Sequence, residues 1–439
     1  MAGRDSALIR VVFALFAFAV TASGSFVDGE TLVITKGPYL QNPKPDSMTI
    51  KWEYTPPEPP FWKGTPTKTP TPDRTPAPDT LPSFKETDRI QGTVRYGTDD
   101  SLKQYVTISK SIEARYLWRK GPVETAYLFT CTLKGLSPGT KYYYQVETSE
   151  GTSDLSHFKT PPNEGDRFTF VAYGNTKFGV PHAEIARVIE KENPDFIIHT
   201  GDMVTDGRNY WQWEETFFKP LANVIDHIPI WPVMGNSDRR GSKEAERIFQ
   251  LLFSLPGDEL RYSFDYGPAH FVCLDCYRMV RNPEDVEWCE KDLTGSKALW
   301  KIVFTHDPAF NSGGYEPKRG RKQYVPMFQN CGVNMHLSGR CRFYQRFHPL
   351  YLTGTDPRSS IVYVITGAAT WGFDDPAANP TVAGAAKKRH YIFFSGEGTK
   401  LSARVMDLEG KTIDRFTIVK NKDGSYADSH LETAIEAPE

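Results

Sequence analysis

The sequence predicts two domains, an all-β sandwich followed by a larger α/β domain, and two observations support this order. Short strand-like segments separated by turn residues fill residues 31–146, which is typical of a β-sandwich. From residue 168 onward, continuous apolar strands alternate with helical segments, which is the pattern of an α/β domain. A chain of 439 residues is long enough to bury a core in each domain.

Residues 1–25 have the features of a secretory signal peptide. Arg4 and Arg10 precede an apolar run over residues 11–20, and small residues follow up to Ser25. The run is shorter than the about 20 apolar residues that cross a membrane, so we expect cleavage and secretion. An uncleaved membrane anchor is the alternative, and only in that case does the sequence predict contact with a membrane.

The predicted sandwich covers residues 26–160. Its strands are expected at residues 31–34, 47–52, 92–97, 126–131 and 141–146. Residues 55–88 are rich in Pro, Thr and charge and contain too little apolar surface to pack, so we expect a solvated or polyproline-like insertion in a sandwich loop.

The predicted α/β domain covers residues 166–420, after a linker at residues 160–166. Helices are expected at residues 182–192 and 211–224 because apolar side chains recur there at helical spacing. Strands are expected at residues 168–173, 195–199, 230–234, 261–266, 270–275, 301–305, 333–338, 361–366, 390–395, 401–407 and 414–419. The polar end, residues 421–439, is expected to be disordered.

Polar motifs follow five of the predicted strands, and ligands of open α/β sheets bind beyond the carboxyl ends of strands. The motifs are Gly174-Asn175-Thr176, Gly201-Asp202-Met203-Val204-Thr205, Gly235-Asn236-Ser237-Asp238, His306-Asp307-Pro308 and Gly339-Arg340-Cys341-Arg342. Arg340 and Arg342 are two residues apart, so in an extended segment their side chains point the same way.

The order and spacing of these motifs resemble those of the calcineurin-like metallophosphoesterases, and of the purple acid phosphatases in particular. The motif Gly37-Pro38-Tyr39-Leu40-Gln41 resembles the N-terminal domain of the purple acid phosphatases, and the pattern over residues 136–144 resembles fibronectin type III modules. The resemblance covers roughly residues 31–420. It implies a two-sheet α/β sandwich and hydrolysis of phosphate esters with two metal ions, for which Fe, Zn and Mn suit the oxygen and nitrogen ligands.

The resemblance also assigns ligand positions. Asp202 stands at the carboxylate that bridges the metals, and Asn236 and His306 stand at ligands of the second metal. These three ligand positions are retained, and Asp202 and His306 are the catalytic candidates if the protein is active.

Other positions of the resemblance are substituted. Asn175 replaces an aspartate of the first metal, Arg342 a histidine of the first metal and Arg340 a histidine of the second. Ser237 replaces a histidine that helps to protonate the leaving group, and Thr205 stands where the purple enzymes have the tyrosine that colours them.

These substitutions predict a degenerate metal centre. A guanidinium has no lone pair to offer, stays charged at working pH and repels a metal ion. Two unit charges about 4 Å apart repel by about 4 kcal/mol at an effective dielectric constant of 20. We therefore expect no metal ion or at most one, little or no phosphatase activity, and an anion site in which Arg340 or Arg342 pairs with Asp202.

Three alternatives remain open. The two arginines can simply satisfy Asp202 and hold their loop, with no ligand. The chain can be an active phosphoesterase with one metal on Asp202, Asn236 and His306, or with a site rebuilt from Asp238 and Asp307. Lastly, it can be a surface interaction module that binds an unidentified protein through the sandwich and its insertion.

The other histidines and the tryptophan near these motifs are expected to have mainly structural roles. His199 is expected to be buried and hydrogen-bonded, His182 structural or on the rim, and Trp371 either cleft-lining or packed. The net charge of −2 gives no reason to expect a nucleic acid partner, so the expected ligand is a phosphorylated or anionic small molecule.

The cysteines permit disulfides in an exported chain, and Cys331 and Cys341 flank a strand that they can staple. Cys273 and Cys276 are expected on opposite faces of one strand, which argues against a zinc site. The full set is Cys131, Cys273, Cys276, Cys289, Cys331 and Cys341.

Overall fold

The computed structural model describes residues 33–55, 82–119, 121–149, 151–163, 165, 167–313, 321–350, 361–421 and 426–434. The predicted signal peptide and most of the predicted insertion lie outside these residues. Among the described residues, no helix is long and apolar enough to cross a membrane.

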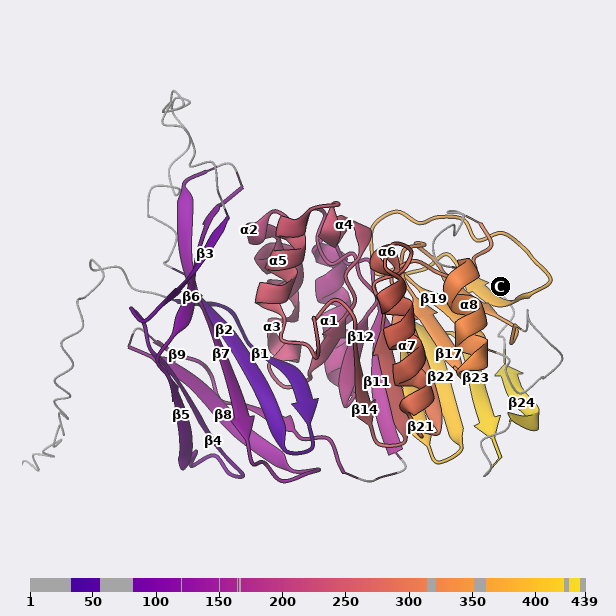
Figure 1. Ribbon diagram of the computed structural model, residues 1–439, viewed down its shortest axis with the longest axis horizontal. Helices are drawn as coiled ribbons and strands as arrows, with labels where there is room; N and C mark the ends of the chain where they lie inside the picture. The colour runs from indigo at the N-terminus through magenta and orange to yellow at the C-terminus, as the bar shows by residue number, and fades with distance from the viewer. Residues whose placement is uncertain are drawn as a thin grey trace, which may run out of the picture. The chain divides into compact units, whose positions relative to one another are not determined.

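The N-terminal part is a sandwich of two antiparallel sheets, ordered β1-β2-β7-β6-β3 and β10-β8-β4-β5, with β9 beside β8 (Figure 1). The period-2 pattern shows in β8, which buries Tyr142, Tyr144 and Val146 and leaves the residues between them partly exposed. The strands are β1 (Val33–Lys44), β2 (Ser47–Thr55), β3 (Ser83–Thr87), β4 (Gly92–Gly97), β5 (Gln104–Ile108), β6 (Ser111–Leu117), β7 (Val123–Lys134), β8 (Lys141–Thr148), β9 (Gly151–Thr152) and β10 (Ser156–Lys159).

The C-terminal part has two seven-stranded sheets, ordered β13-β12-β11-β21-β22-β23-β24 and β14-β15-β16-β17-β19-β18-β20. The strands are β11 (Arg167–Tyr173), β12 (Phe196–His199), β13 (Ile230–Pro232), β14 (Tyr262–Tyr266), β15 (Ala269–Cys273), β16 (Trp300–Thr305), β17 (Met335–Ser338), β18 (Tyr344–Phe347), β19 (Val362–Thr366), β20 (Val382–Ala386), β21 (His390–Glu397), β22 (Lys400–Asp407), β23 (Thr412–Lys420) and β24 (Tyr426–Ala434).

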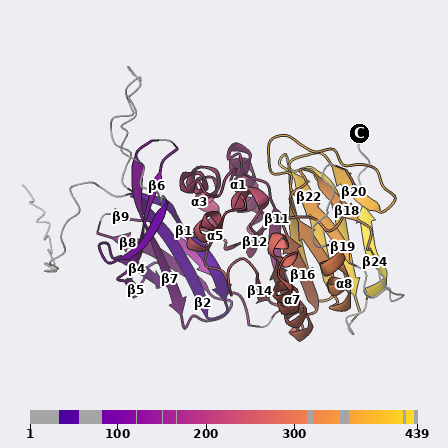
Figure 2. The same cartoon turned by 45° about the horizontal axis from the view of Figure 1, so that its top comes forward.

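Helices cover both outer faces of this pair of sheets, with α7 and α8 on the side opposite to α1 and α3 (Figures 1 and 2). Aromatic rings fill the space between the sheets: Phe170 packs on Phe271 with ring centroids 5.4 Å apart, and Trp231 stacks on Phe264 at 3.8 Å. The helices are α1 (Val180–Glu192), α2 (Tyr210–Gln212), the π-helical turn η2 (Trp213–Phe218), α3 (Lys219–Ile225), α4 (Asn236–Arg239), α5 (Lys243–Leu252), α6 (Cys276–Met279), α7 (Pro283–Gly295) and α8 (Arg321–Asn330).

Three predictions about local structure need correction. Residues 426–434 form the edge strand β24 rather than a disordered tail, because they pair with β23. Residues 83–87, inside the predicted insertion, form β3 by pairing with β6. Cys276 begins helix α6 and does not share a strand with Cys273.

The predicted staple between Cys331 and Cys341 is also not formed. All six cysteines are buried free thiols. The arginine-loop strand β17 is held instead by backbone pairing with β16 and β19 on its two sides.

A buried ion pair joins the two sheets directly after the arginine loop. The Arg346 guanidinium on β18 donates from Nε to Asp414 Oδ2 on β23 at 2.8 Å, and the Tyr344 hydroxyl donates to the same oxygen at 2.6 Å. Both charged side chains are essentially inaccessible to solvent. A charge this deeply buried depends on its partner.

We expect Asp414→Ala to lower the free energy of unfolding by about 3–5 kcal/mol, because it leaves Arg346 buried and unpaired. Urea unfolding measures this. Lys110→Ala is the control, since its ion pair with Glu86 is exposed on both sides, and should cost no more than about 1 kcal/mol. Equal losses in the two variants would show that the buried pair does not join the sheets as described.

Candidate functional site

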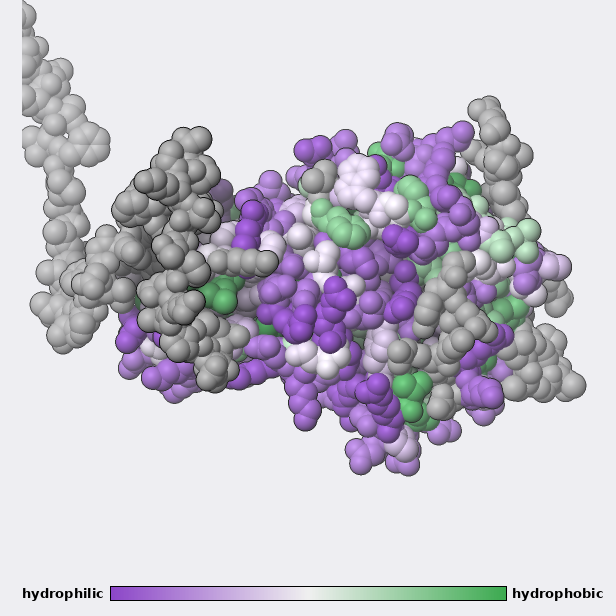
Figure 3. Space-filling view, turned by 90° about the horizontal axis from the view of Figure 1, so that it is seen from above, coloured by the Kyte–Doolittle hydropathy of each residue, from purple (hydrophilic) through white to green (hydrophobic). Residues whose placement is uncertain are grey.

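Five loops at one edge of the sheets bring the candidate residues together. β11, β12 and β13 are parallel neighbours in the first sheet, and β16 and β17 are parallel neighbours in the second. Their carboxyl ends therefore meet at one edge, near α4 and α6 in Figure 1. The face seen from above is mainly hydrophilic (Figure 3).

Asp202 lies at the centre of this edge and is 2% exposed. Its Oδ1 accepts a hydrogen bond from the Ser237 backbone N–H at 2.8 Å, and its Oδ2 accepts from the Ser237 hydroxyl at 3.1 Å. The Lys177 ammonium donates to the same Oδ2 at 2.7 Å and lies 3.2 Å from the Ser237 hydroxyl. The counter-charge of the central carboxylate is thus a lysine that sequence reasoning missed.

The electrostatics of Asp202 follow from these neighbours. Burial by itself raises the pKa of the carboxyl, but His306, Lys177 and the hydrogen bond from Lys177 outweigh burial and hold the pKa of Asp202 below its ordinary value. Asp202 therefore carries its negative charge at neutral pH.

Asp238 positions the loop that carries Asp202. Its Oδ2 accepts from the backbone N–H groups of Asp202 and Gly235, and its Oδ1 accepts from those of Met203 and Val204, at 2.8–3.0 Å. Burial and the charge of Asp202 raise the pKa of Asp238 to about 7. With both oxygens bonded to backbone N–H groups, Asp238 holds the loop that carries Asp202.

His306 and Asn236 approach Asp202 from the other side. The His306 ring donates from Nδ1 to the Thr200 carbonyl at 2.7 Å, so Nε2 points at the site. Nε2 lies 3.1 Å from Asn236 Oδ1 and 3.4 Å from Asp202 Oδ1. Gly201 permits this approach, because its φ is +92° and a Cβ there would meet His306 Nδ1 at 2.6 Å.

Arg340 contacts Asn236 rather than Asp202. Its Nη1 donates to Asn236 Oδ1 at 2.7 Å and to the Tyr277 hydroxyl at 2.9 Å, and lies 3.5 Å from Asp307 Oδ1. The Tyr277 hydroxyl in turn donates to Asp307 at 2.6 Å. Asp307 therefore supports the arginine and the tyrosine.

Arg342 pairs with Asp374 at the rim. Its Nη2 donates to Asp374 Oδ1 at 2.8 Å, and its backbone N–H donates to Asp374 Oδ2 at 2.9 Å. The expectation that Arg340 or Arg342 would pair with Asp202 is therefore wrong. Lys177, in the loop after β11, takes that role with its ammonium 2.7 Å from Asp202 Oδ2.

Asn175 is fully buried and holds two loops together. Its Nδ2 donates to the carbonyl oxygens of Gly367 at 2.8 Å and Arg340 at 3.1 Å. The amide nitrogen is thereby directed at carbonyl groups of the fifth loop and the loop after β19. Asn175 acts here as a structural bridge.

Two family models match the chain. The model of calcineurin-like phosphoesterases matches residues 179–339, and the model of the purple acid phosphatase N-terminal domain matches residues 37–160. The chain contains a calcineurin-like metallophosphoesterase domain and a purple acid phosphatase N-terminal domain, and its relatives include purple acid phosphatases. The first match contains Asp202, Asn236 and His306 and ends before Arg340.

The relatives include purple acid phosphatase 21 of Arabidopsis thaliana, 27% identical over 241 residues, which is 51% of this chain and 54% of the relative. Acid phosphatase type 7 of Homo sapiens is 25% identical over 284 residues, covering 55% of this chain and 64% of the relative. The Danio rerio protein of that name is 24% identical over 357 residues, which cover 69% of this chain and 79% of the relative. The chain thus spans less than two thirds of the length of the first two.

Solved structures show the same fold. The purple acid phosphatase PPD1 from yellow lupin (Lupinus luteus) seeds gives a TM-score of 0.70 at 17% identity, over 90% of this chain and 75% of that chain. PhoD gives a TM-score of 0.65 at 15% identity, and the match covers 95% of this chain and 94% of PhoD. The predicted order, a β-sandwich followed by an α/β metallophosphoesterase domain, is confirmed.

The family is metal-dependent, and the residues at the first-metal position do not fit a cation. The Lys177 ammonium is bonded to Asp202 Oδ2, and Arg342 is a cation itself. The one uncommitted oxygen there is the neutral Asn175 Oδ1, which is buried without a hydrogen-bond partner among the described residues. In the second-metal position three donor atoms converge, but the Arg340 guanidinium is bonded to one of them. The described residues contain no group of three or more His, Cys, Asp or Glu that could hold a metal ion.

The other residues singled out from the sequence have structural places. His199 and His182 are buried and hydrogen-bonded, the first to Thr176 and the second to Tyr173. Burial lowers the pKa of His182 to about 4. Thr205 donates to Gln212 Oε1 at 2.6 Å.

Trp371 is not core packing. Its side chain is 51% exposed, and the Arg389 guanidinium lies over its ring at 4.5 Å from the centroid. It follows β19 on the same side of the domain as Arg342, since Gly372 next to it approaches the Arg342 guanidinium.

We expect Lys177→Met to lower the free energy of unfolding by about 2–4 kcal/mol at neutral pH, because it removes the amine bonded to buried Asp202. Chemical denaturation measures this loss. Lys387→Met is the matched control, because its ion pair with Asp375 is exposed and should contribute less than about 1 kcal/mol. A Lys177 variant as stable as the control would mean that Asp202 has another counter-charge.

Proposed function

We propose that this chain is an exported purple acid phosphatase-like protein whose degenerate metal centre is weakly active or inactive and binds a phosphate group or another anion. One observation carries the proposal: the carboxylate that bridges the metals in the family is paired here with the Lys177 ammonium at 2.7 Å. A lysine donates hydrogen bonds and offers no lone pair while it is charged.

The charges around the site support this proposal. Asn175 contributes no charge where the family has a carboxylate, and Lys177, Arg340 and Arg342 add three cations, of which Arg340 also faces Asp307 and Arg342 also pairs with Asp374. Two positive unit charges 4 Å apart repel each other by about 4 kcal/mol at an effective dielectric constant of 20. The repulsion between one such charge and a divalent cation is about twice as large. Basic side chains therefore do the electrostatic work of the metals.

Anion binding follows from the chemistry of the same side chains. Arg340 and Arg342 are 24% and 37% exposed, and Lys177 is 19% exposed, so solutes reach all three. Guanidinium groups bind phosphate and carboxylate through paired N–H donors. The ligand class we propose is a phosphorylated or anionic small molecule, in keeping with a family that acts on phosphate esters.

A second candidate function is phosphate-ester hydrolysis with a single metal ion, Fe, Zn or Mn. The observation that favours it is the convergence of Asp202 Oδ1, Asn236 Oδ1 and His306 Nε2, in which Nε2 faces two oxygen atoms at 3.1 and 3.4 Å. A cation between these atoms would require Arg340 to leave Asn236.

Metal analysis separates the two candidates. We expect the full chain, incubated with Fe, Zn and Mn and then desalted, to retain no stoichiometric metal by elemental analysis and to hydrolyse phosphate esters weakly or not at all. Basic side chains at the ligand atoms exclude the ion. About one equivalent of metal together with turnover would instead establish the single-metal enzyme.

Restoring the family's ligands tests the role of Lys177 directly. The variant Asn175→Asp/Arg340→His/Arg342→His is compared with the same variant carrying Lys177→Ala as well. We expect the fourth substitution to increase Zn affinity by about 100-fold or more, since it removes a charge beside the bridging carboxylate. Equal Zn affinities for the two variants would contradict our account of Lys177.

Phosphate binding tests the positive half of the proposal. We expect inorganic phosphate to bind the full chain in the presence of a chelator, and Arg340→Ala to weaken binding by about 10-fold or more through loss of charged hydrogen bonds. Titration calorimetry measures both. Arg89→Ala, on the exposed surface of the sandwich, is the control and should leave the affinity unchanged.

A further inference from the structure

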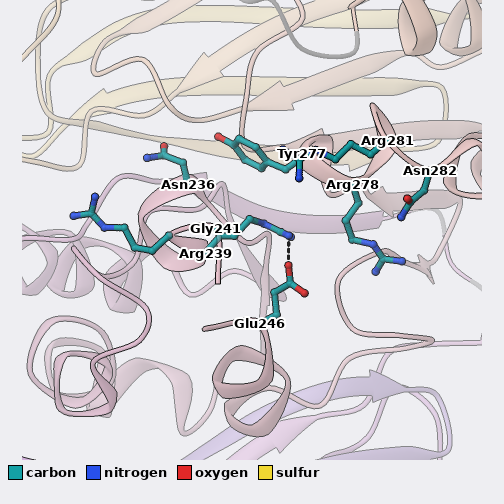
Figure 4. A pocket seen from close by; sticks show the side chains of 9 residues that line it. Asn236, Arg239, Gly241, Glu246, Tyr277, Arg278, Arg281 and Asn282 are labelled. Atoms are coloured by element: carbon teal, nitrogen blue, oxygen red, sulfur yellow. Dashed lines mark hydrogen bonds and ion pairs between the residues drawn. The ribbon is translucent and has the colours of Figure 1, made fainter. Parts of the chain in front are cut away.

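A second cationic feature adjoins the site. A cavity of about 610 Å³ lies between the segment that begins at Asn236 and the segment that begins at Tyr277 (Figure 4). We call it the arginine pocket. Its lining includes four arginines, Arg239, Arg240, Arg278 and Arg281, together with Asn236 and Tyr277. Its volume falls in the range of small-molecule sites.

Two of the four arginines are neutralised by carboxylates. Arg239 pairs with Glu246 and with buried Asp275 (Figure 4 shows the pair with Glu246). Arg278 pairs with Asp258 at 2.8 Å and lies 3.4 Å from Asp285. These two arginines are accounted for by the fold.

Arg240 and Arg281 are different. Both are exposed, and neither forms an ion pair with a carboxylate in the part of the chain that the structure describes. Arg240 donates only from Nε to the Thr205 carbonyl, at 3.1 Å. Arg240 and Arg281 are therefore the two arginines of the pocket without a direct carboxylate contact in the described part of the chain, although the charge of Arg240 helps to lower the pKa of nearby Asp206.

The arginine pocket continues directly from Arg340. The Arg340 guanidinium bonds to Asn236 Oδ1 at 2.7 Å and to the Tyr277 hydroxyl at 2.9 Å, and both of these residues line the pocket. An anion bound to Arg340 would therefore lie next to Asn236 and Tyr277, which form part of the pocket wall. The wall has one aromatic ring, that of Tyr277, and no aliphatic side chain.

We propose that the arginine pocket binds the further phosphates of a ligand whose first phosphate lies at Arg340, and that the ligand class is a chain of linked phosphates. This inference rests on the proposed anion site at Arg340. Linked phosphates fit because they carry several charges and no apolar part, and because guanidinium groups match phosphate oxygens in paired hydrogen bonds. Arg240 and Arg281 supply the charge that the distal phosphates require.

Titration calorimetry of the full chain tests this, with inorganic phosphate and inorganic tripolyphosphate as probes at fixed ionic strength with chelator present. Wild type is expected to bind tripolyphosphate at least about 10-fold more tightly than phosphate. Arg240→Gln/Arg281→Gln is expected to abolish this preference and to leave phosphate affinity within about twofold. Arg89→Gln/Arg415→Gln, which removes two exposed arginines elsewhere, should keep the preference.

Every other outcome overturns either the arginine pocket or the anion site at Arg340. A preference that survives in Arg240→Gln/Arg281→Gln, or that is lost equally in Arg89→Gln/Arg415→Gln, overturns the arginine pocket. Phosphate binding that depends on Arg340, with no preference for tripolyphosphate, overturns the pocket and leaves the proposed function standing. Tripolyphosphate binding that depends on Arg240 and Arg281 but not on Arg340 supports the pocket and overturns the proposed function.

Discussion

The ion pair between Lys177 and Asp202 is the interaction on which the site depends. A carboxylate that is 2% exposed needs a counter-charge, and in a metal-dependent relative the metal ions provide it. The lysine meets the same need with one hydrogen-bonded cation. The loops around Asp202 then stay in place through Ser237 and Asp238, whose bonds to backbone and carboxylate need no metal.

Because Lys177 supplies the counter-charge of Asp202, the two arginines of the fifth loop contact other residues. Arg340 bonds to Asn236 and Tyr277, and Arg342 to Asp374. The neutral amide of Asn175 and the two arginines of the fifth loop therefore accompany a lysine that supplies the counter-charge of Asp202.

The sequence was sufficient for the order of the domains and the positions of the five loops, because apolar strands followed by glycine-containing turns are local patterns. Lys177 was not predictable in this way, since a lysine in a loop has no periodicity and its partner is 25 residues away. β24 and β3 were missed because pairing with a neighbouring strand, rather than apolar content, makes them strands. The ion pair between Arg346 and Asp414 depends on the same long-range pairing.

The positive charge of this edge is local, because the whole chain carries a net charge of −2. Cations gathered on neighbouring loops repel one another and cost stability unless carboxylates or a ligand offset them. Ion pairs offset Arg239 and Arg278, so a purely structural role explains these two. It does not explain Arg240 and Arg281, which line the same cavity and form no direct ion pair with a carboxylate among the described residues. An anionic ligand with several charges accounts for both arginines and for their closeness to Arg340.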